Sequence, residues 1–166
     1  MKNSNENKIT FTMGLPAAGK STVIANNYAG FNVIDPDQIK KASPLYTAWL
    51  NDMNSHPTFH ADSTNKAKEI FDNVTANGTG NHVVDGTGTN VEELVSKIMQ
   101  ANNSGFVTEL VWVQITLEEA IYRNNTRERT VPVEILTSKA EYIDTAFDIA
   151  TKYVDNAIII NNNKRN

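Results

Sequence analysis

Residues 14–21 read Gly-Leu-Pro-Ala-Ala-Gly-Lys-Ser and match the pattern G-x-x-x-x-G-K-[ST] in full. Glycines at these positions let backbone N–H groups turn toward a phosphate, while the lysine places its charge on the β- and γ-phosphates. The final hydroxyl can bind Mg²⁺, and the N-terminus of a following helix adds partial positive charge. The pattern therefore predicts a nucleotide-binding loop rather than an ordinary glycine turn, formed by Gly14, Leu15, Pro16, Ala17, Ala18, Gly19, Lys20, Ser21 and Thr22.

Two carboxylates follow a short apolar run, in the segment Asp35-Pro36-Asp37. An enzyme that transfers a phosphoryl group needs a carboxylate near the acceptor hydroxyl, to orient the hydroxyl and to take its proton. Asp37 could serve in this way, or it could cap the helix that begins after it. Position alone favours neither interpretation, and one side chain can do both.

A third acid, Asp85, ends another apolar run and precedes the loop 86–90. An apolar strand that ends in aspartate is typical of a Walker B segment, in which the carboxylate holds Mg²⁺ directly or through water. The two glycines of the loop allow the backbone to approach a ligand, and its threonines offer hydroxyl groups. We favour a substrate-facing loop; the alternative is a glycine turn in which Asn90 caps the next helix.

Three of the four arginines lie within seven residues, at Arg123, Arg127 and Arg129, whereas the chain uses lysine nearly everywhere else. Arg123 and Arg127 are four residues apart, so on a helix they would share one face. Two guanidinium groups on one face repel each other unless an anion lies between them, and a transferred phosphoryl group is such an anion. The cluster favours a lid over the phosphates. A solvated helix face paired with nearby glutamates is the alternative.

The class of nucleotide-binding protein is narrowed by a missing motif. No Asn-Lys pair in the chain continues to the N-K-x-D sequence with which GTPases read guanine. The small size of the chain favours a kinase that moves a γ-phosphoryl group to the hydroxyl of a bound acceptor. A nucleotide-binding switch or ATPase without an acceptor is the alternative from another class.

These motifs lie in an alternating series of strands and helices. We expect strands at 9–13, 31–34, 82–85, 106–115 and 157–160. We expect helices at 20–28, 60–77, 91–101, 117–127 and 132–153, with short helical pieces between 39 and 50. The alternation predicts an α/β fold with a parallel sheet, whose last strand should also be buried because it is apolar. Each motif follows a strand, and ligands of such sheets bind at the carboxyl ends of the strands.

The composition sets wider limits. A length of 166 residues fits one domain, and the absence of cysteine excludes disulfides, thiol nucleophiles and cysteine-bound metals. The formal net charge of −4 argues against a strongly basic surface for nucleic acid. It does not exclude a local basic groove. No segment reaches the roughly 20 apolar residues of a membrane span, and no signal peptide is recognisable. We therefore expect a cytoplasmic protein without membrane contact.

Four segments, at 14–22, 33–37, 84–90 and 123–132, occur in the order in which they occur in a known family. With them the chain resembles the P-loop kinases that include the zeta toxins and the kinase domain of bacteriophage polynucleotide kinase. The resemblance covers about residues 8–160. It implies a three-layer P-loop NTPase fold, with a five-stranded parallel sheet in the order 2-3-1-4-5 and an arginine-bearing helical lid.

The resemblance also bears on the extent of the domain. It implies a single P-loop kinase domain over residues 1–166, and the polar residues at both ends predict loose ends at 1–7 and 162–166. Residues 161–163 follow the last expected strand, where related kinases place a loop that contacts adenine. A polar tail is an equally good interpretation of these residues.

Roles for the acids come from the same resemblance. Asp37, the second acid after the second strand, corresponds to the catalytic base. Lys40 stands where related kinases have a basic residue that meets the acceptor, in some of them an arginine. Asp85 corresponds to an acid that contacts the acceptor. The implied acceptor-binding set is Asp35, Lys40, Asp85, Gly86 and Thr87.

The arginines correspond to the lid. Arg123 and Arg127 fit the spacing of the phage kinase, whereas Arg129 fits the zeta-toxin arrangement before a proline. The second lid arginine therefore stays open between Arg127 and Arg129. The implied catalytic set is Lys20, Asp37, Arg123, Arg127 and Arg129.

The resemblance implies ATP and Mg²⁺ as cofactors, with the metal held by Ser21 and Asp85. Its two branches imply different acceptors: zeta toxins phosphorylate a nucleotide-activated amino sugar, and the phage enzyme a polynucleotide 5′-hydroxyl. Because the chain is acidic, we favour a small-molecule or nucleotide-type acceptor. A polynucleotide 5′-hydroxyl kinase is the alternative. The sequence does not decide whether the chain has a protein partner such as an antitoxin.

Overall fold

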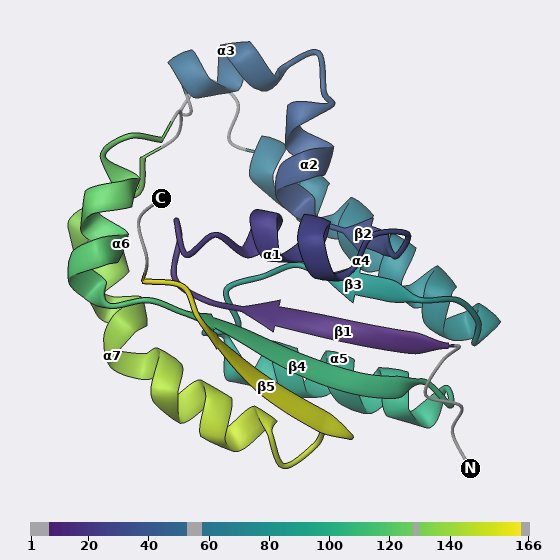
Figure 1. The fold of residues 1–166 in the computed structure, drawn as a ribbon. Coiled ribbons are helices and arrows are strands. Elements are labelled where there is room, and N and C mark those ends of the chain that lie inside the picture. Colours follow the sequence, from purple (N-terminus) through teal and green to yellow (C-terminus); the bar gives the residue numbers. More distant parts are fainter. Residues whose placement is uncertain (1–6, 53–57, 128–129, 164–166) are drawn as a thin grey trace.

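The computed structural model describes residues 7–52, 58–127 and 130–163 (Figure 1). Its strands are β1 (Lys8–Met13), β2 (Asn32–Ile34), β3 (His82–Val84), β4 (Val107–Gln114) and β5 (Asn156–Asn161). Its helices are α1 (Lys20–Asn27), α2 (Pro36–Lys41), α3 (Tyr46–Asn51), α4 (Phe59–Asn77), α5 (Val91–Asn103), α6 (Leu117–Asn124) and α7 (Val133–Ala150). None of the helices in these ranges has both the length and the apolar character that a membrane crossing requires.

The strands form one parallel sheet in the order β2-β3-β1-β4-β5. The central strand is β1, in which Phe11 pairs with Val84 of β3 on one side and with Leu110 of β4 on the other. Helices lie on both faces of this sheet (Figure 1). The predicted three-layer P-loop NTPase fold and its strand order are confirmed.

Side chains of β1 and β4 show which helix covers which face. Phe11 contacts Phe71 of α4, with the ring centroids 6.1 Å apart. Thr10 precedes Phe11 and therefore points to the opposite face, as does its partner Glu109 in β4. The carboxylate of Glu109 accepts a hydrogen bond of 2.7 Å from the hydroxyl of Tyr28, which directly follows α1. Helices α1 and α4 therefore cover opposite faces, and α5 contacts both β4 and α7.

The last strand, β5, is exposed rather than buried. Ile158 and Ile159 expose 43% and 49% of their surface. The strand lies at the edge of the sheet, where it pairs with β4 on one side. The expectation of a buried strand is wrong because an apolar run shows what a strand is able to bury, not whether neighbouring elements cover it.

The helix expected over residues 117–127 ends at Asn124, as α6. Beyond it the amides of Thr126 and Arg127 donate to the carbonyls of Arg123 and Asn124, which forms turns rather than a further helical turn. The residues Asn124, Asn125 and Thr126 are weak helix formers, which explains the early end. Arg127 therefore lies beyond the helix, and the expectation that it shares a helix face with Arg123 is wrong.

Two residues that were expected in a loose end, Asn162 and Asn163, are held against the sheet. The amide of Asn162 donates to the carbonyl of Gln114 at 2.8 Å. The side-chain oxygen of Asn163 accepts a hydrogen bond of 2.8 Å from the amide of Thr116. The chain beyond β5 thus continues along the segment that follows β4, at the carboxyl ends of the strands, where the predicted site lies.

Candidate active site

The carboxyl ends of β1, β2 and β3 meet at one edge of the sheet. The loop after β1 leads into α1, the loop after β2 into α2, and the loop after β3 into α5. These three loops, together with the first turns of α1 and α2, contain the phosphate-binding pattern and all three predicted acids. The fold thus gathers residues that lie up to about 70 positions apart in the sequence.

The loop after β1 has the backbone shape of an anion-binding loop. Ala17 and Gly19 have φ angles of 70° and 91°, in the left-handed region. A residue with a side chain costs roughly 1–2 kcal/mol there, and strain of this kind collects at ligand sites. Helix α1 begins without a side-chain cap, and within the described residues the amides of Gly19, Lys20 and Ser21 donate no hydrogen bond. Unused donors at a helix start fit the oxygens of a phosphate.

Lys20 lies against its own loop, where its ammonium donates to two loop carbonyls at 3.1 and 3.2 Å. Removal from water lowers the pKa of Lys20, and the nearby charge of Asp85 counteracts this effect. The charges of Arg127 and Lys139 also lower this pKa, whereas that of Asp37 raises it. Charged side chains from four other segments therefore act on one ammonium group.

The loop after β3 lies directly against the phosphate loop. The amide of Gly14 donates to the carbonyl of Thr87 at 3.0 Å. A Cβ atom on Gly14 would lie 2.7 Å from the carbonyl oxygen of Val113, and one on Gly88 would lie 2.5 Å from the Cβ of Met13. Glycine at these two positions therefore allows the two loops and the strands beneath them to approach closely.

Asp85 follows β3 and is held in place by β1. The hydroxyl of Thr12 donates to a carboxylate oxygen of Asp85 at 2.8 Å, and the amide of Gly86 donates to the same hydroxyl at 3.3 Å. Burial and the charge of Asp85 raise the pKa of Asp35 to about 6. Two carboxylates from neighbouring strands thus face each other at this edge.

Asp37 lies in the first turn of α2 and does not cap it. The cap is Asp35, whose carboxylate accepts a hydrogen bond of 2.9 Å from the amide of Asp37. The side chain of Asp37 is 56% exposed, and one of its oxygens lies 3.5 Å from the Nζ of Lys40. Of the two interpretations of Asp37, the cap is therefore wrong, and its carboxylate is directed toward solvent and Lys40.

Lys40 is buried, with 1% of its side chain exposed. Its Nζ lies 5.0 Å from the ring centroid of Trp49, which contacts the rings of Tyr46 and Phe59. A buried ammonium group needs an anion or an aromatic face, and Asp37 and Trp49 provide both. Lys40 was expected to meet the acceptor. In the structure its ammonium lies beneath the surface, behind the carboxylate of Asp37.

Arg123 extends from α6 to the side of the phosphate loop. Its guanidinium donates to the carboxylate of Glu119 at 3.1 Å, to the carbonyl of Ala18 at 3.3 Å and to the carbonyl of Asn162. The side chain of Asn162 donates to the same Ala18 carbonyl at 2.7 Å. Asn162 therefore supports the phosphate loop together with Arg123, which neither interpretation of residues 161–163 included.

The other clustered arginines differ in position. Arg127 is exposed, and its charge reaches Lys20, whose pKa it lowers. Arg129 lies outside the described residues. Arg123 and Arg127 therefore approach the phosphate loop in different ways, one as a hydrogen-bonded support and the other as an exposed charge.

Two residues of this region, Thr12 and Lys139, were not singled out by the sequence, and Asn162 was considered only as part of the segment 161–163. A threonine within a strand buried on both faces was a usable signal, because a buried hydroxyl needs a partner. Lys139 lies on α7 and donates to the hydroxyl of Thr89 at 3.2 Å. Nothing in the local sequence distinguishes it from a surface lysine, or Asn162 from the other asparagines near the C-terminus.

Ser21 and Asp85 fit a Mg²⁺ site by the chemistry of their oxygens, which Mg²⁺ prefers as ligands. Ser21 lies in the first turn of α1, directly after the phosphate lysine. Within the described ranges, no group of three or more His, Cys, Asp or Glu side chains could hold a metal. The two oxygens would therefore share the ion with phosphate oxygens and water, as is usual for Mg²⁺ at nucleotide sites.

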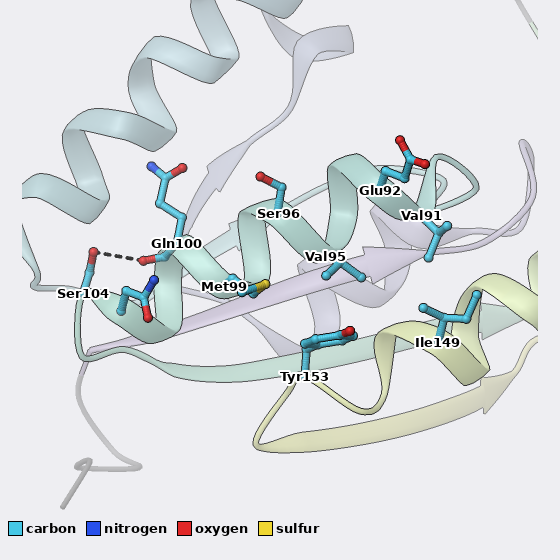
Figure 2. A pocket seen from close by; sticks show the side chains of 10 residues that line it. Val91, Glu92, Val95, Ser96, Met99, Gln100, Ser104, Ile149 and Tyr153 are labelled. Carbon is cyan, nitrogen blue, oxygen red and sulfur yellow. Dashed lines mark hydrogen bonds between the residues drawn. The ribbon is translucent and has the colours of Figure 1, made fainter.

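A groove of about 720 Å³ lies elsewhere, along α5 and the end of α7. Figure 2 shows its apolar lining, to which Val95, Met99 and Tyr153 contribute. None of its lining residues belongs to the phosphate loop, to α2 or to residues 85–89. We therefore place the candidate active site at the sheet edge, where the charged residues gather, and not in this groove.

A family model described as an AAA domain matches residues 9–147. The match includes the phosphate loop, both loops with the predicted acids, and α6. The chain belongs to the AAA domain family. In this AAA domain the matched range also includes Lys139, whereas β5 and Asn162 follow it.

Several solved structures have the same fold as this AAA domain. One is a chain of the PezAT chromosomal toxin–antitoxin system of Streptococcus pneumoniae, with a TM-score of 0.72 and 13% identity over 95% of this chain and 69% of that chain. Another comes from the complex AvrRxo1-ORF1:AvrRxo1-ORF2, with a TM-score of 0.68 and 17% identity over 89% of this chain and 50% of that chain. The AAA domain thus spans half the length of the second relative.

Two kinases of similar length share the fold. The deoxyadenosine kinase from M. mycoides with bound dATP has a TM-score of 0.59 and 12% identity, over 93% of this chain and 90% of that chain. A gluconokinase from Sinorhizobium meliloti has a TM-score of 0.52 and 12% identity, over 96% and 85% of the two chains. No curated protein matches the sequence. The likenesses confirm, at the level of the fold, the resemblance to P-loop kinases.

Proposed function

We propose that this AAA domain is an ATP- and Mg²⁺-dependent phosphotransferase, which moves the γ-phosphoryl group of ATP to a hydroxyl of a small-molecule or nucleotide-type acceptor. The observation that carries the proposal is the convergence of Asp37 and Asp85 on the phosphate lysine, Lys20. A module that only binds nucleotide needs the lysine, whereas transfer to a hydroxyl also needs a carboxylate beside the phosphates. The fold shared with a deoxyadenosine kinase and a gluconokinase supports the same class.

The triphosphate would bind at the start of α1. The amides of Gly19, Lys20 and Ser21 donate to its oxygens, and the Lys20 ammonium exchanges its two loop carbonyls for phosphate oxygens. Ser21 and Asp85 would hold Mg²⁺, which when bound neutralises charge on the β- and γ-phosphates.

Asp37 would act as the general base. Its exposed carboxylate orients the acceptor hydroxyl and takes its proton while the hydroxyl oxygen attacks the γ-phosphorus and the bond to the departing ADP breaks. Lys40 lies behind this carboxylate, 3.5 Å away, and would fix its position from below. We therefore assign Lys40 to the positioning of the base rather than to contact with the acceptor.

The acceptor would lie along the loops that follow β2 and β3. Asp85 is oriented by Thr12, so one of its carboxylate oxygens has a fixed direction. Asp35, Gly86 and Thr87 complete the wall beside it, which supports the acceptor-binding set expected from the sequence.

The arginines would divide their roles. Arg127, whose charge reaches Lys20, stabilises the charge on the phosphoryl group during transfer. Arg123 holds the Ala18 carbonyl and so maintains the shape of the phosphate loop. Arg129 remains a candidate for the second lid arginine.

The test is transfer of label from γ-labelled ATP to a panel of nucleosides, nucleotide sugars and 5′-hydroxyl oligonucleotides. We expect Lys20→Ala and Asp37→Asn each to lower transfer by about 100-fold or more, with ATP binding nearly intact in the second variant. Asp62→Asn is the matched control, because Asp62 is also an exposed aspartate in the first turn of a helix, α4.

Three outcomes would change the assignment. Label recovered only as free phosphate, whatever the acceptor, would identify an ATPase or a nucleotide switch. Label on the oligonucleotides would identify a polynucleotide kinase. Transfer by Asp37→Asn at the wild-type rate would show that another group is the base.

A further inference from the structure

Lys139 extends from α7 to the loop after β3. Its Nζ donates to the hydroxyl oxygen of Thr89 at 3.2 Å, and that oxygen lies 3.3 Å from the hydroxyl oxygen of Thr87. The carbonyl of Thr87 accepts a hydrogen bond of 3.0 Å from the amide of Gly14, in the phosphate loop. A continuous series of polar contacts therefore connects the second turn of α7 with the phosphate loop through two threonines.

No carboxylate compensates the charge of Lys139 within the described part of the chain, where no Asp or Glu lies within ion-pair distance of its Nζ. Partial burial lowers the pKa of Lys139. Its charge in turn lowers the pKa of Lys20, so the two ammonium groups are close enough to repel each other. A partly dehydrated cation without a counter-charge is stabilised when an anion binds beside it.

We propose that Lys139 and the hydroxyl groups of Thr87 and Thr89 form a subsite for a phosphate carried by the acceptor. The inference rests on the proposed function and narrows its acceptor to molecules that have both a phosphate and a free hydroxyl. An ammonium group and two hydroxyls carry five donor hydrogens. Two of them are used in the Lys139–Thr89 and Thr87–Thr89 contacts, which leaves three for a ligand. Donors of this kind, one of them charged, match the oxygens of a phosphate.

The side-chain contact of Lys139 distinguishes it from the groups that would serve the transferred phosphoryl group. That group is served by Lys20, by the loop amides and by Arg127. Lys139 instead contacts Thr89, two residues beyond the Thr87 carbonyl that touches the phosphate loop. A phosphate held there belongs to the second substrate, and it would fix the acceptor beside Asp85, which lies in the same loop.

The test compares nucleosides with their own 3′- and 5′-monophosphates as acceptors, so that each hydroxyl stays available in at least one phosphorylated form. In Lys139→Gln we expect kcat/KM for the phosphorylated acceptors to fall about 10- to 100-fold, the usual range for one charged hydrogen bond. For the unphosphorylated nucleosides we expect a change within about twofold. Lys152→Gln is the matched control, because Lys152 is an exposed lysine just beyond the end of α7.

An equal loss for both kinds of acceptor would overturn the inference, since Lys139 would then act on ATP or on the transferred group. A kcat/KM of Lys139→Gln for the phosphorylated acceptors that equals the wild-type value would overturn it as well. Neither result would touch the proposed function, which fails only if the wild-type protein labels no acceptor at all.

A binding measurement keeps the inference testable even then. With a non-hydrolysable ATP analogue present, the wild-type protein should be stabilised against heat by a nucleoside monophosphate more than by the nucleoside. Lys139→Gln should lose this difference, and Lys152→Gln should keep it. Equal stabilisation by both members of the pair in the wild-type protein, or by neither, would contradict the subsite.

Discussion

Lys40 is an ammonium group placed where water does not reach it. It is held between the carboxylate of Asp37 and the ring of Trp49, on a helix of only six residues. A charge in such a place has little freedom to move, so it defines the position of whatever it pairs with. The carboxylate of Asp37 is thereby fixed on one side and exposed on the other, which suits the role of general base that we propose for it.

We predict that Lys40→Met lowers kcat about 10- to 100-fold while the KM for the acceptor changes little, because the base loses its position but the acceptor loses no contact. The free energy of unfolding should stay within about 1 kcal/mol of wild type, since methionine fills a similar space under Trp49. Steady-state kinetics and urea denaturation measure the two effects. Lys41→Met, at the exposed neighbouring position, should change neither. A rise in acceptor KM alone would instead restore the acceptor-binding role of Lys40.

Asp35 makes stability depend on pH. Its folded pKa of about 6 lies above the ordinary value of 3.8, so between these values the folded state binds the extra proton. Stability from this group is therefore lost as the pH rises from about 4 to about 6. After allowance for solvent, we expect Asp35→Asn to remove a penalty on the order of 1 kcal/mol at pH 7 and almost nothing at pH 4. Asparagine can still cap α2.

Urea denaturation of wild type and Asp35→Asn at both pH values measures this difference. Asp144→Asn is the control, because Asp144 is an exposed aspartate on α7. A difference between wild type and Asp35→Asn that is the same at pH 4 and pH 7 would show that the proton on Asp35 is not its cause.

At the scale of elements, local patterns predicted most of the architecture. Continuous apolar runs indicated strands buried on both faces, and glycine with Lys20 marked the turn into α1. Because parallel strands end at one edge, the acids after β2 and β3 could be placed beside the phosphate loop before any contact was known.

What local patterns could not predict were the effects of neighbouring elements. The apolar run of β5 has the composition of a central strand, but its place at the edge leaves Ile158 and Ile159 exposed. The spacing of Arg123 and Arg127 would place both on one face of a helix that continued to Arg127, but α6 ends at Asn124. The contact of Lys139 with Thr89 depends on how α7 lies against the sheet, which no local signal records.

The loop after β3 provides an internal comparison between two glycines. Gly88 has a φ of 77° and no room for a Cβ against Met13, whereas Gly86 has open space around it. We predict that Gly88→Ala lowers the free energy of unfolding by about 2–4 kcal/mol, through backbone strain and overpacking. Gly86→Ala should change it by less than about 0.5 kcal/mol. Chemical denaturation of both variants measures these free energies of unfolding. Equal losses in the two variants would mean that the close approach of the loop to β1 contributes nothing to stability.

Across the whole molecule, the phosphate loop is supported by parts that follow it far along the chain. The carbonyl of Ala18 accepts hydrogen bonds from Arg123 after β4 and from Asn162 after β5. The sheet brings these segments together because β4 and β5 lie beside β1 and run parallel to it.

We predict that Asn162→Ala weakens ATP binding about 3- to 10-fold, because the loss of one hydrogen bond of about 1 kcal/mol lets the loop relax before nucleotide binds. Isothermal titration with a non-hydrolysable ATP analogue measures the effect. Asn161→Ala, at the exposed end of β5, is the control. Unchanged affinity in Asn162→Ala would show that Arg123 alone maintains the loop.

The two hydrogen bonds on Ala18 also bear on how the protein becomes competent. They join residues 105 and 144 positions apart, and contacts so distant form late because chain entropy opposes them. During synthesis and folding, the residues of the phosphate loop are therefore present well before Arg123 and Asn162 can form their hydrogen bonds with Ala18. Nucleotide affinity should rise only once β4 and β5 have joined the sheet, which makes ATP binding a marker of the completed fold.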